Sequence, residues 1–207
     1  MLRLDHVVYA VPDLDEAAVR FREEFGLDSI EGGRHERWGT ANRIVSIGDQ
    51  YLELVAAVDN QVAAETAFGR GVLEHAAGGG GWFTIAAVTD ELDAVASRLG
   101  LAVTTGSRTR PDGEILRWRS AGLDDPRREA WMPFFIAWEV TDELHPGRAR
   151  AGHAARATGI AWVEVGGDAG RLRAWLGGDE LPIGVSYGEP GIHRVAISTA
   201  DGDLVIE

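Results

Sequence analysis

The first regular segment of the chain decides the fold, and it reads Leu-Asp-His-Val-Val-Tyr-Ala-Val-Pro-Asp-Leu at residues 4–14. Its first eight residues predict a strand, and Pro12-Asp13 then predicts a turn into a helix. That helix is expected to end at Gly26. The strands expected after it cover residues 29–34, 41–47 and 51–58. This part of the chain therefore predicts a β-α-β-β-β unit.

The same order of elements returns twice in the rest of the sequence. After the four glycines at 78–81, the pattern predicts a strand and then a helix that ends at Gly100. The further strands expected in this second copy lie at 102–105, 114–120 and 133–138. A third and shorter copy begins at Ile160. Repetition of one unit indicates that the chain uses a small architecture several times.

A β-α-β-β-β unit leaves one face of its sheet uncovered, so two units are expected to close around a cavity. The sequence therefore predicts an α+β fold. Its paired βαβββ modules, at about 1–58 and 82–139, would form an incomplete barrel with a small-molecule cavity. We expect a domain over 1–144, a linker at 145–159 and an additional C-terminal βαβββ-like unit at 160–207. The pattern does not decide which modules pair, or whether they pair within one chain, and a homodimer is expected.

Composition narrows the possible functions. The 207 residues are 45% hydrophobic and 26% charged, and none is cysteine, which excludes a disulfide scaffold and a thiol nucleophile. The net charge is −13 and all 20 basic residues are arginine, so Schiff-base lysine chemistry is excluded. Such an acidic chain is a poor partner for nucleic acid or an anionic membrane. We expect a cytoplasmic protein with a small-molecule ligand, no nucleic acid and no membrane partner.

The opening strand and the repeated unit resemble the vicinal oxygen chelate superfamily, which includes glyoxalases, bleomycin resistance proteins and dioxygenases. The run Gly-Gly-Arg-His-Glu-Arg-Trp-Gly-Thr-Ala-Asn-Arg at 32–43, followed by Tyr-Leu-Glu-Leu at 51–54, resembles the glyoxalase-like domain group within it. Residues 133–139 and His145-Pro146 resemble the second half of that group. The resemblance covers about residues 1–146 and implies the barrel fold with a ligand cavity.

The resemblance also implies a metal site. Metal-binding members place a histidine on the first strand and a carboxylate on the fourth strand of each half, and His6 and Glu53 match these positions. A divalent ion there (Zn, Mn, Fe, Ni or Co) would bind vicinal oxygens of the substrate, and Glu53 would be the catalytic proton carrier. In the second half the matching positions are Phe83 or Thr84 and a residue among 134–136, none of which is a good ligand.

Other interpretations of these residues remain. His6 and Glu53 would equally serve to hydrogen-bond a ligand without a metal, or satisfy one another as a buried polar pair. The candidate substrate-binding residues are Arg34, His35, Trp38, Asn42 and Trp138, because aromatic rings and an arginine clamp suit a small anionic or planar ligand. The alternative for 32–43 is a bulged hairpin whose Trp38 plugs the barrel end.

A cluster of arginines surrounds Trp118 in the second half. Its members are Arg108, Arg110, Arg117 and Arg119. Alternation along a strand places Arg117 and Arg119 on the face opposite Trp118. If Trp118 faces the cavity, we expect these arginines in solvent.

Three functions follow from these features. The favoured one is a glyoxalase-like, divalent-metal-dependent lyase, isomerase or dioxygenase that acts on a small oxygen-bearing metabolite. The alternative is a metal-free small-molecule binding or resistance protein with the same cavity. A third uses the repeated unit mainly for assembly, with the C-terminal copy as a dimerisation module.

Overall fold

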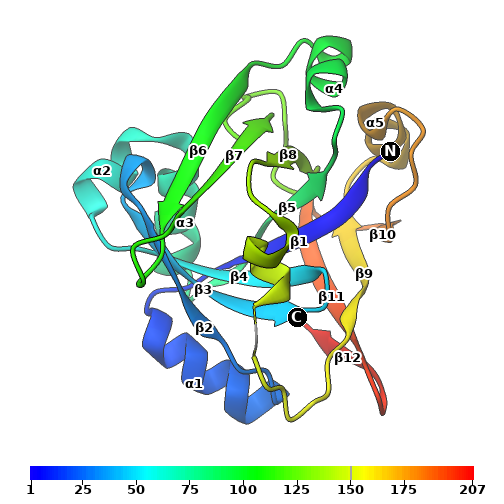
Figure 1. Ribbon diagram of the computed structural model, residues 1–207. Helices are drawn as coiled ribbons and strands as arrows, with labels where there is room; N and C mark the ends of the chain where they lie inside the picture. The colour runs from blue at the N-terminus through cyan, green and yellow to red at the C-terminus, as the bar shows by residue number, and fades with distance from the viewer. Residues whose placement is uncertain (150) are drawn as a thin grey trace.

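Eight strands form a closed barrel in the order β1-β4-β3-β2-β6-β7-β8-β5 (Figure 1). The computed structural model describes residues 1–149 and 151–207, so Arg150 of the predicted linker lies outside the described residues. The strands are β1 (Arg3–Ala10), β2 (Ile30–His35), β3 (Thr40–Ile47), β4 (Gln50–Ala57), β5 (Gly81–Val88), β6 (Val103–Thr109), β7 (Ile115–Ala121) and β8 (Phe134–Trp138). An α+β fold with a ligand pocket inside the barrel agrees with the sequence prediction.

The barrel is closed, whereas the sequence predicted an incomplete one. Strands β2 and β6 meet through a single ladder pair, Arg34 with Thr109. A Cβ atom at Gly33, whose φ is +140°, would lie 2.1 Å from the backbone oxygen of Thr109. Only glycine tolerates such a close approach of two backbones, and this is what allows the gap between the two halves to close.

Helices cover the outside and one end of the barrel. They are α1 (Leu14–Phe25), α2 (Asn60–Glu65), α3 (Ala67–Ala77), α4 (Leu92–Leu99) and α5 (Ala169–Leu176), with 3₁₀ turns η1 (Glu36–Trp38), η2 (Asp142–Leu144) and η3 (Pro146–Arg148). Helix α1 begins after Asp13, whose carboxylate accepts from two backbone N–H groups, and it ends at Gly26 in the left-handed conformation. None of the described helices is long and apolar enough to span a membrane.

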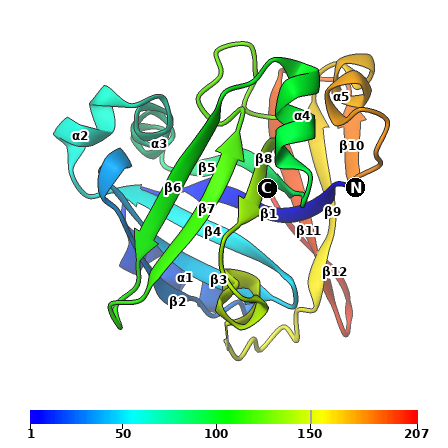
Figure 2. The ribbon, with the colours of Figure 1, turned by 45° about the horizontal axis from the view of Figure 1, so that its top comes forward.

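The C-terminal strands form a second sheet in the order β10-β9-β11-β12. They are β9 (Gly159–Gly166), β10 (Ile183–Ser186), β11 (Gly191–Thr199) and β12 (Gly202–Ile206). This sheet lies against the outer face of the barrel, with β11 beside β5 and β9 beside β4 (Figure 2). Residues Val163 and Val195 of the sheet belong to the same buried cluster as Leu52 and Ile85 of the barrel. The third unit therefore buries its apolar face against its own chain.

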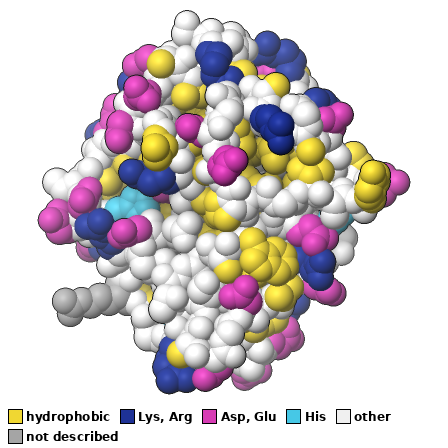
Figure 3. Space-filling model, turned by 90° about the vertical axis from the view of Figure 1, so that its right-hand side faces the viewer, with side chains coloured by type: hydrophobic (Ala, Val, Ile, Leu, Met, Phe, Trp, Pro, Cys, Tyr) yellow, Lys and Arg dark blue, Asp and Glu magenta, His cyan; other side chains and the backbone are white. Residues whose placement is uncertain are grey.

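Surface charges are mixed on the side that carries the second sheet. In Figure 3, arginines lie singly among acidic side chains on this face. Examples from this sheet are the ion pairs Arg194–Glu164 and Arg156–Asp201. Exposed pairs of this kind contribute little to stability.

Candidate functional site

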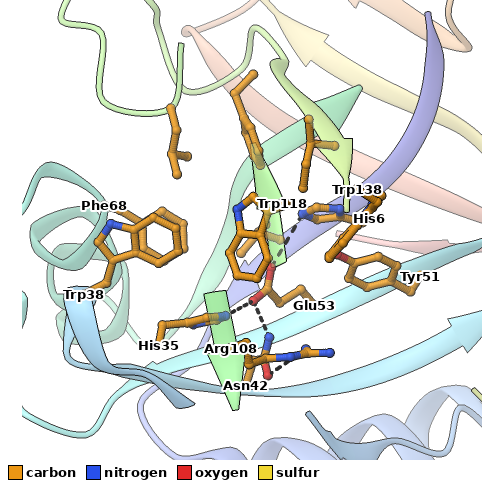
Figure 4. Close-up of a pocket in the computed structure, with 14 residues that line it drawn as sticks. His6, His35, Trp38, Asn42, Tyr51, Glu53, Phe68, Arg108, Trp118 and Trp138 are labelled. Carbon is orange, nitrogen blue, oxygen red and sulfur yellow. Dashed lines mark hydrogen bonds and ion pairs between the residues drawn. The ribbon is translucent and has the colours of Figure 1, made fainter. Parts of the chain in front are cut away.

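A pocket lies inside the barrel (Figure 4). Its apolar wall is largely aromatic and includes Trp38, Phe68, Trp118, Phe134 and Trp138. Its polar wall consists mainly of His6, His35, Asn42, Glu53 and Arg108. The cavity volume is about 30 Å³, which is room for roughly two or three water-sized groups. The pocket therefore suits a small compound, and a larger one would require the aromatic side chains to move.

Glu53 is the centre of the polar wall. Strands β1 and β4 pair in parallel with Val8 opposite Glu53, so His6 and Glu53 both face the interior. Glu53 Oε2 lies 3.6 Å from His6 Nε2, and Glu53 Oε1 lies 3.8 Å from His35 Nε2. The Asn42 amide donates to Glu53 Oε1 at 2.6 Å. One carboxylate oxygen is thus held by Asn42, while the other faces His6.

His6 is oriented from behind by Asp5. The pairing of β1 with β5 shifts register between Leu4 and His6, so Asp5 sits in a β-bulge without a partner on β5. The Asp5 carboxylate accepts a hydrogen bond from His6 Nδ1 at 2.6 Å. Because a carboxylate only accepts, His6 carries its proton on Nδ1 and presents the Nε2 lone pair to Glu53. The His6 ring also stacks on Tyr51, with 4.4 Å between ring centroids.

Two more donors fix Asp5. His145 Nε2 lies 3.1 Å from Asp5 Oδ1, and Trp138 Nε1 donates to Asp5 Oδ2 at 3.3 Å. The Gly147 N–H donates to His145 Nδ1, so His145 carries its proton on Nε2 and donates it to Asp5. Burial by itself raises the pKa of Asp5, but the hydrogen bonds from His145 and His6 outweigh it and bring that pKa down to about 2. Asp5 is therefore ionised throughout the neutral range.

Arg108 is the pocket residue that the sequence placed wrongly. Its side chain was expected in solvent, yet it is buried and its Nη1 donates to Asn42 Oδ1 at 3.1 Å. The β6–β7 register pairs Arg108 with Leu116, which shares the inward face of β7 with Trp118. Arg117 faces outward and is exposed, as expected. Counting outward from the turn at 110–113 would have predicted the inward orientation of Arg108.

The other predicted site residues divide clearly by strand face. His6, Glu53, His35, Trp38, Asn42 and Trp138 all line the pocket. Arg34 does not, because it alternates with the inward-facing His35 and is exposed on the outside of β2. The sequence offered no clear signal for Phe68, which reaches the pocket from the unpredicted helix α3.

His35 makes folding sensitive to acid. Burial lowers its pKa from 6.5 to about 4, so the native state keeps it neutral where the unfolded chain would protonate it. The free energy of unfolding should therefore fall as the pH drops from 6.5 towards 4, by about 3 kcal/mol from this residue alone. The measurement is urea denaturation of wild type and His35→Gln at several pH values. The variant should lose this part of the pH dependence, and parallel curves for the two proteins would contradict the prediction.

The donor set of the pocket falls short of a metal site. No group of three or more His, Asp or Glu side chains in residues 1–149 and 151–207 is arranged to hold a metal ion. His6 Nε2 and Glu53 Oε2 are two converging donors, but the β8 positions are filled by Phe134 and Ile136. The positive charge of Arg108 on the same wall also opposes a cation. The residues present do not fit a divalent ion held by the protein alone.

A barrel of this strand order, with His6 and Glu53 facing one interior pocket, defines a protein of the vicinal oxygen chelate superfamily. Within it, the chain belongs to the glyoxalase-like domain family, whose sequence model matches residues 4–181. The resemblance found in the sequence is thereby confirmed. No protein of curated function matches this sequence significantly.

Solved structures share the fold at low sequence identity. A hypothetical protein from Staphylococcus aureus is 20% identical, with a TM-score of 0.68 over 99% of this chain and 84% of that chain. A Streptomyces coelicolor methylmalonyl-CoA epimerase variant in complex with 2-nitronate-propionyl-CoA is 22% identical, with a TM-score of 0.49 over 67% of this chain and 98% of that chain. The Mycobacterium tuberculosis methylmalonyl-CoA epimerase is 22% identical, with a TM-score of 0.45 over 65% of this chain and 85% of that chain.

Proposed function

We propose that this protein is a lyase or isomerase that moves a proton on a small oxygen-bearing metabolite in the barrel pocket. The observation that carries the proposal is the pair of basic atoms, His6 Nε2 and Glu53 Oε2, which lie 3.6 Å apart. Both belong to buried side chains that line the same small pocket. Two positioned groups that exchange protons with a substrate are the usual machinery of general acid–base catalysis.

Each polar residue has a distinct part in this mechanism. Glu53 Oε2 takes a proton from a carbon next to a carbonyl group, and the bonding electrons move onto the carbonyl oxygen. His6 Nε2 is near enough to share that proton and return it to the neighbouring atom, or to a leaving group in a lyase. The ionised Asp5 stabilises the positive charge that His6 then carries, and Asn42 holds Glu53 in place through Oε1.

Deuterium exchange tests this proposal directly, because it reports removal of a proton from carbon whatever the product is. The protein would be incubated in D₂O with pyruvate, 2-oxobutyrate, hydroxyacetone or dihydroxyacetone, and exchange at carbon followed by NMR. We expect accelerated exchange for at least one compound. If tryptophan fluorescence shows that compounds bind while none exchanges, the metal-free binding or resistance function replaces the enzyme. If none binds or exchanges, the proposed substrate class is wrong.

Metal content is the second expected result. Because the donor set has only two converging ligands, protein purified without a metal-affinity tag or chelator should lack near-stoichiometric divalent metal, and exchange should survive EDTA. The measurement is elemental analysis of wild type and His6→Ala. Near-stoichiometric Zn, Mn, Fe, Ni or Co that His6→Ala removes would instead support the metal site predicted from the sequence, along with its dioxygenase outcome.

The remaining features of the predicted organisation stay proposals. They are the two βαβββ modules at about 1–58 and 82–139 in a domain over 1–144, the linker at 145–159, the additional unit at 160–207, the homodimer and the cytoplasmic location. The internal repeat supports the modules. The packing of the second sheet on the barrel removes the need for a partner subunit to cover that sheet.

A further inference from the structure

We propose that the substrate of this pocket is a small carboxylate whose negative charge is bound by the guanidinium of Arg108. The inference rests on the proposed function and names the substrate class of the same site. A carboxylate next to the reacting carbonyl, as in a 2-oxo acid, would meet both requirements of the polar wall: an anion at Arg108 and an acidic C–H near Glu53.

Arg108 has donors to spare. It lines the pocket and is only 5% exposed, and its one hydrogen bond runs from Nη1 to Asn42 Oδ1. Its buried Nε has no hydrogen-bond partner among the described residues. A guanidinium carries five N–H donors, and leaving them unmet in a buried place is costly. A carboxylate accepts from Nε and a neighbouring Nη at once, so it would satisfy these donors in the geometry that arginine prefers.

The charge of Arg108 also lacks a direct partner. Within the described part of the chain, no ion pair joins Arg108 to a carboxylate, because the neutral Asn42 amide stands between it and Glu53. Arg128 shows what an arginine with a structural role looks like in this fold. Its guanidinium donates to the backbone oxygens of Gly122, Leu123 and Met132 and to the Thr84 hydroxyl. Arg108 has no comparable set of acceptors.

The size of the cavity limits the rest of the molecule. A volume of about 30 Å³ leaves little room beyond a carboxylate and a short carbon chain. The aromatic wall, which includes Trp118 and Trp138, would pack against the apolar end of the ligand. Because these tryptophans line the pocket, their fluorescence reports occupancy directly.

Binding of matched acid and neutral compounds tests this proposal. The probes are pyruvate and 2-oxobutyrate, with hydroxyacetone and 2,3-butanedione as neutral counterparts, and the readout is tryptophan fluorescence without turnover. The wild type should bind the acids about tenfold to a hundredfold more tightly than the neutral compounds. Arg108→Gln should remove that preference and leave the affinity for neutral compounds unchanged. Arg117→Gln, an exposed arginine on the adjacent strand β7, is the matched control and should change nothing.

Several results would overturn the proposal. Equal affinity of the wild type for acids and neutral compounds would do so without any variant. So would an Arg108→Gln protein that keeps the preference for acids. If Arg108→Gln does not fold, Arg108→Lys keeps the charge but loses the bidentate geometry and should retain only part of the preference. Carboxylates that bind through Arg108 without deuterium exchange would refute the proposed function alone, whereas exchange restricted to neutral compounds would refute only the carboxylate.

Discussion

Glu53→Gln should lower the rate of deuterium exchange by about 10²–10⁴-fold, the usual contribution of a general base. The glutamine side chain has nearly the same size as glutamate, and its amide oxygen can still accept the hydrogen bond that Asn42 gives to Glu53 Oε1. The atom that faces His6 would become an amide nitrogen, which cannot take a proton from carbon. The measurement is the exchange rate of the best compound from the NMR screen.

A matched substitution separates chemistry from general damage. Glu36→Gln makes the same change on the exposed turn η1 and should leave the exchange rate unaltered. Tryptophan fluorescence should show that Glu53→Gln still binds the compound. An exchange rate within tenfold of the wild type would mean that Glu53 is not the base, and that it is a buried polar partner of His6.

The meeting of His6 and Glu53 was predictable because it depends on regular features. The parallel pairing of β1 with β4 and the two-residue period of strands determine which side chains face the barrel interior. The same period explains why His35 lines the pocket while its neighbour Arg34 does not.

Departures from regular strands were not predictable from the pattern. Alternation places Asp5 and His6 on opposite faces, but the bulge in β1 brings the Asp5 carboxylate to His6 Nδ1. The closure of the barrel depends on how near β6 approaches Gly33, a long-range contact that no local pattern encodes. Arg108 was placed wrongly because its orientation depends on the register of β6 against β7, although the turn at 110–113 carried that information.

Asp5→Asn should reduce kcat for exchange by about 10²–10⁴-fold while changing KM little, because Asp5 acts through His6 and does not line the pocket. An asparagine offers one acceptor atom and one NH₂ donor where the carboxylate accepts from His6, His145 and Trp138 together. If the NH₂ faces His6 Nδ1, the imidazole must carry its proton on Nε2, and the atom that should receive the substrate proton is already occupied. Steady-state exchange kinetics by NMR give the separate values of kcat and KM.

Stability and a control variant make this prediction specific. The pKa of Asp5 is about 2 in the folded protein and 3.8 as the reference value, so its ionised form contributes about 2 kcal/mol of stability above pH 4. This contribution is lost as the pH falls from about 4 to 2, and Asp5→Asn should remove that step from the urea-denaturation profile. Asp49→Asn changes an exposed carboxylate that pairs with Arg148 and should alter neither kinetics nor this step. A positioning role requires the kcat loss in an Asp5→Asn protein that is still folded at neutral pH, so a folded variant with wild-type kcat would show that the Asp5–His6 hydrogen bond serves stability alone.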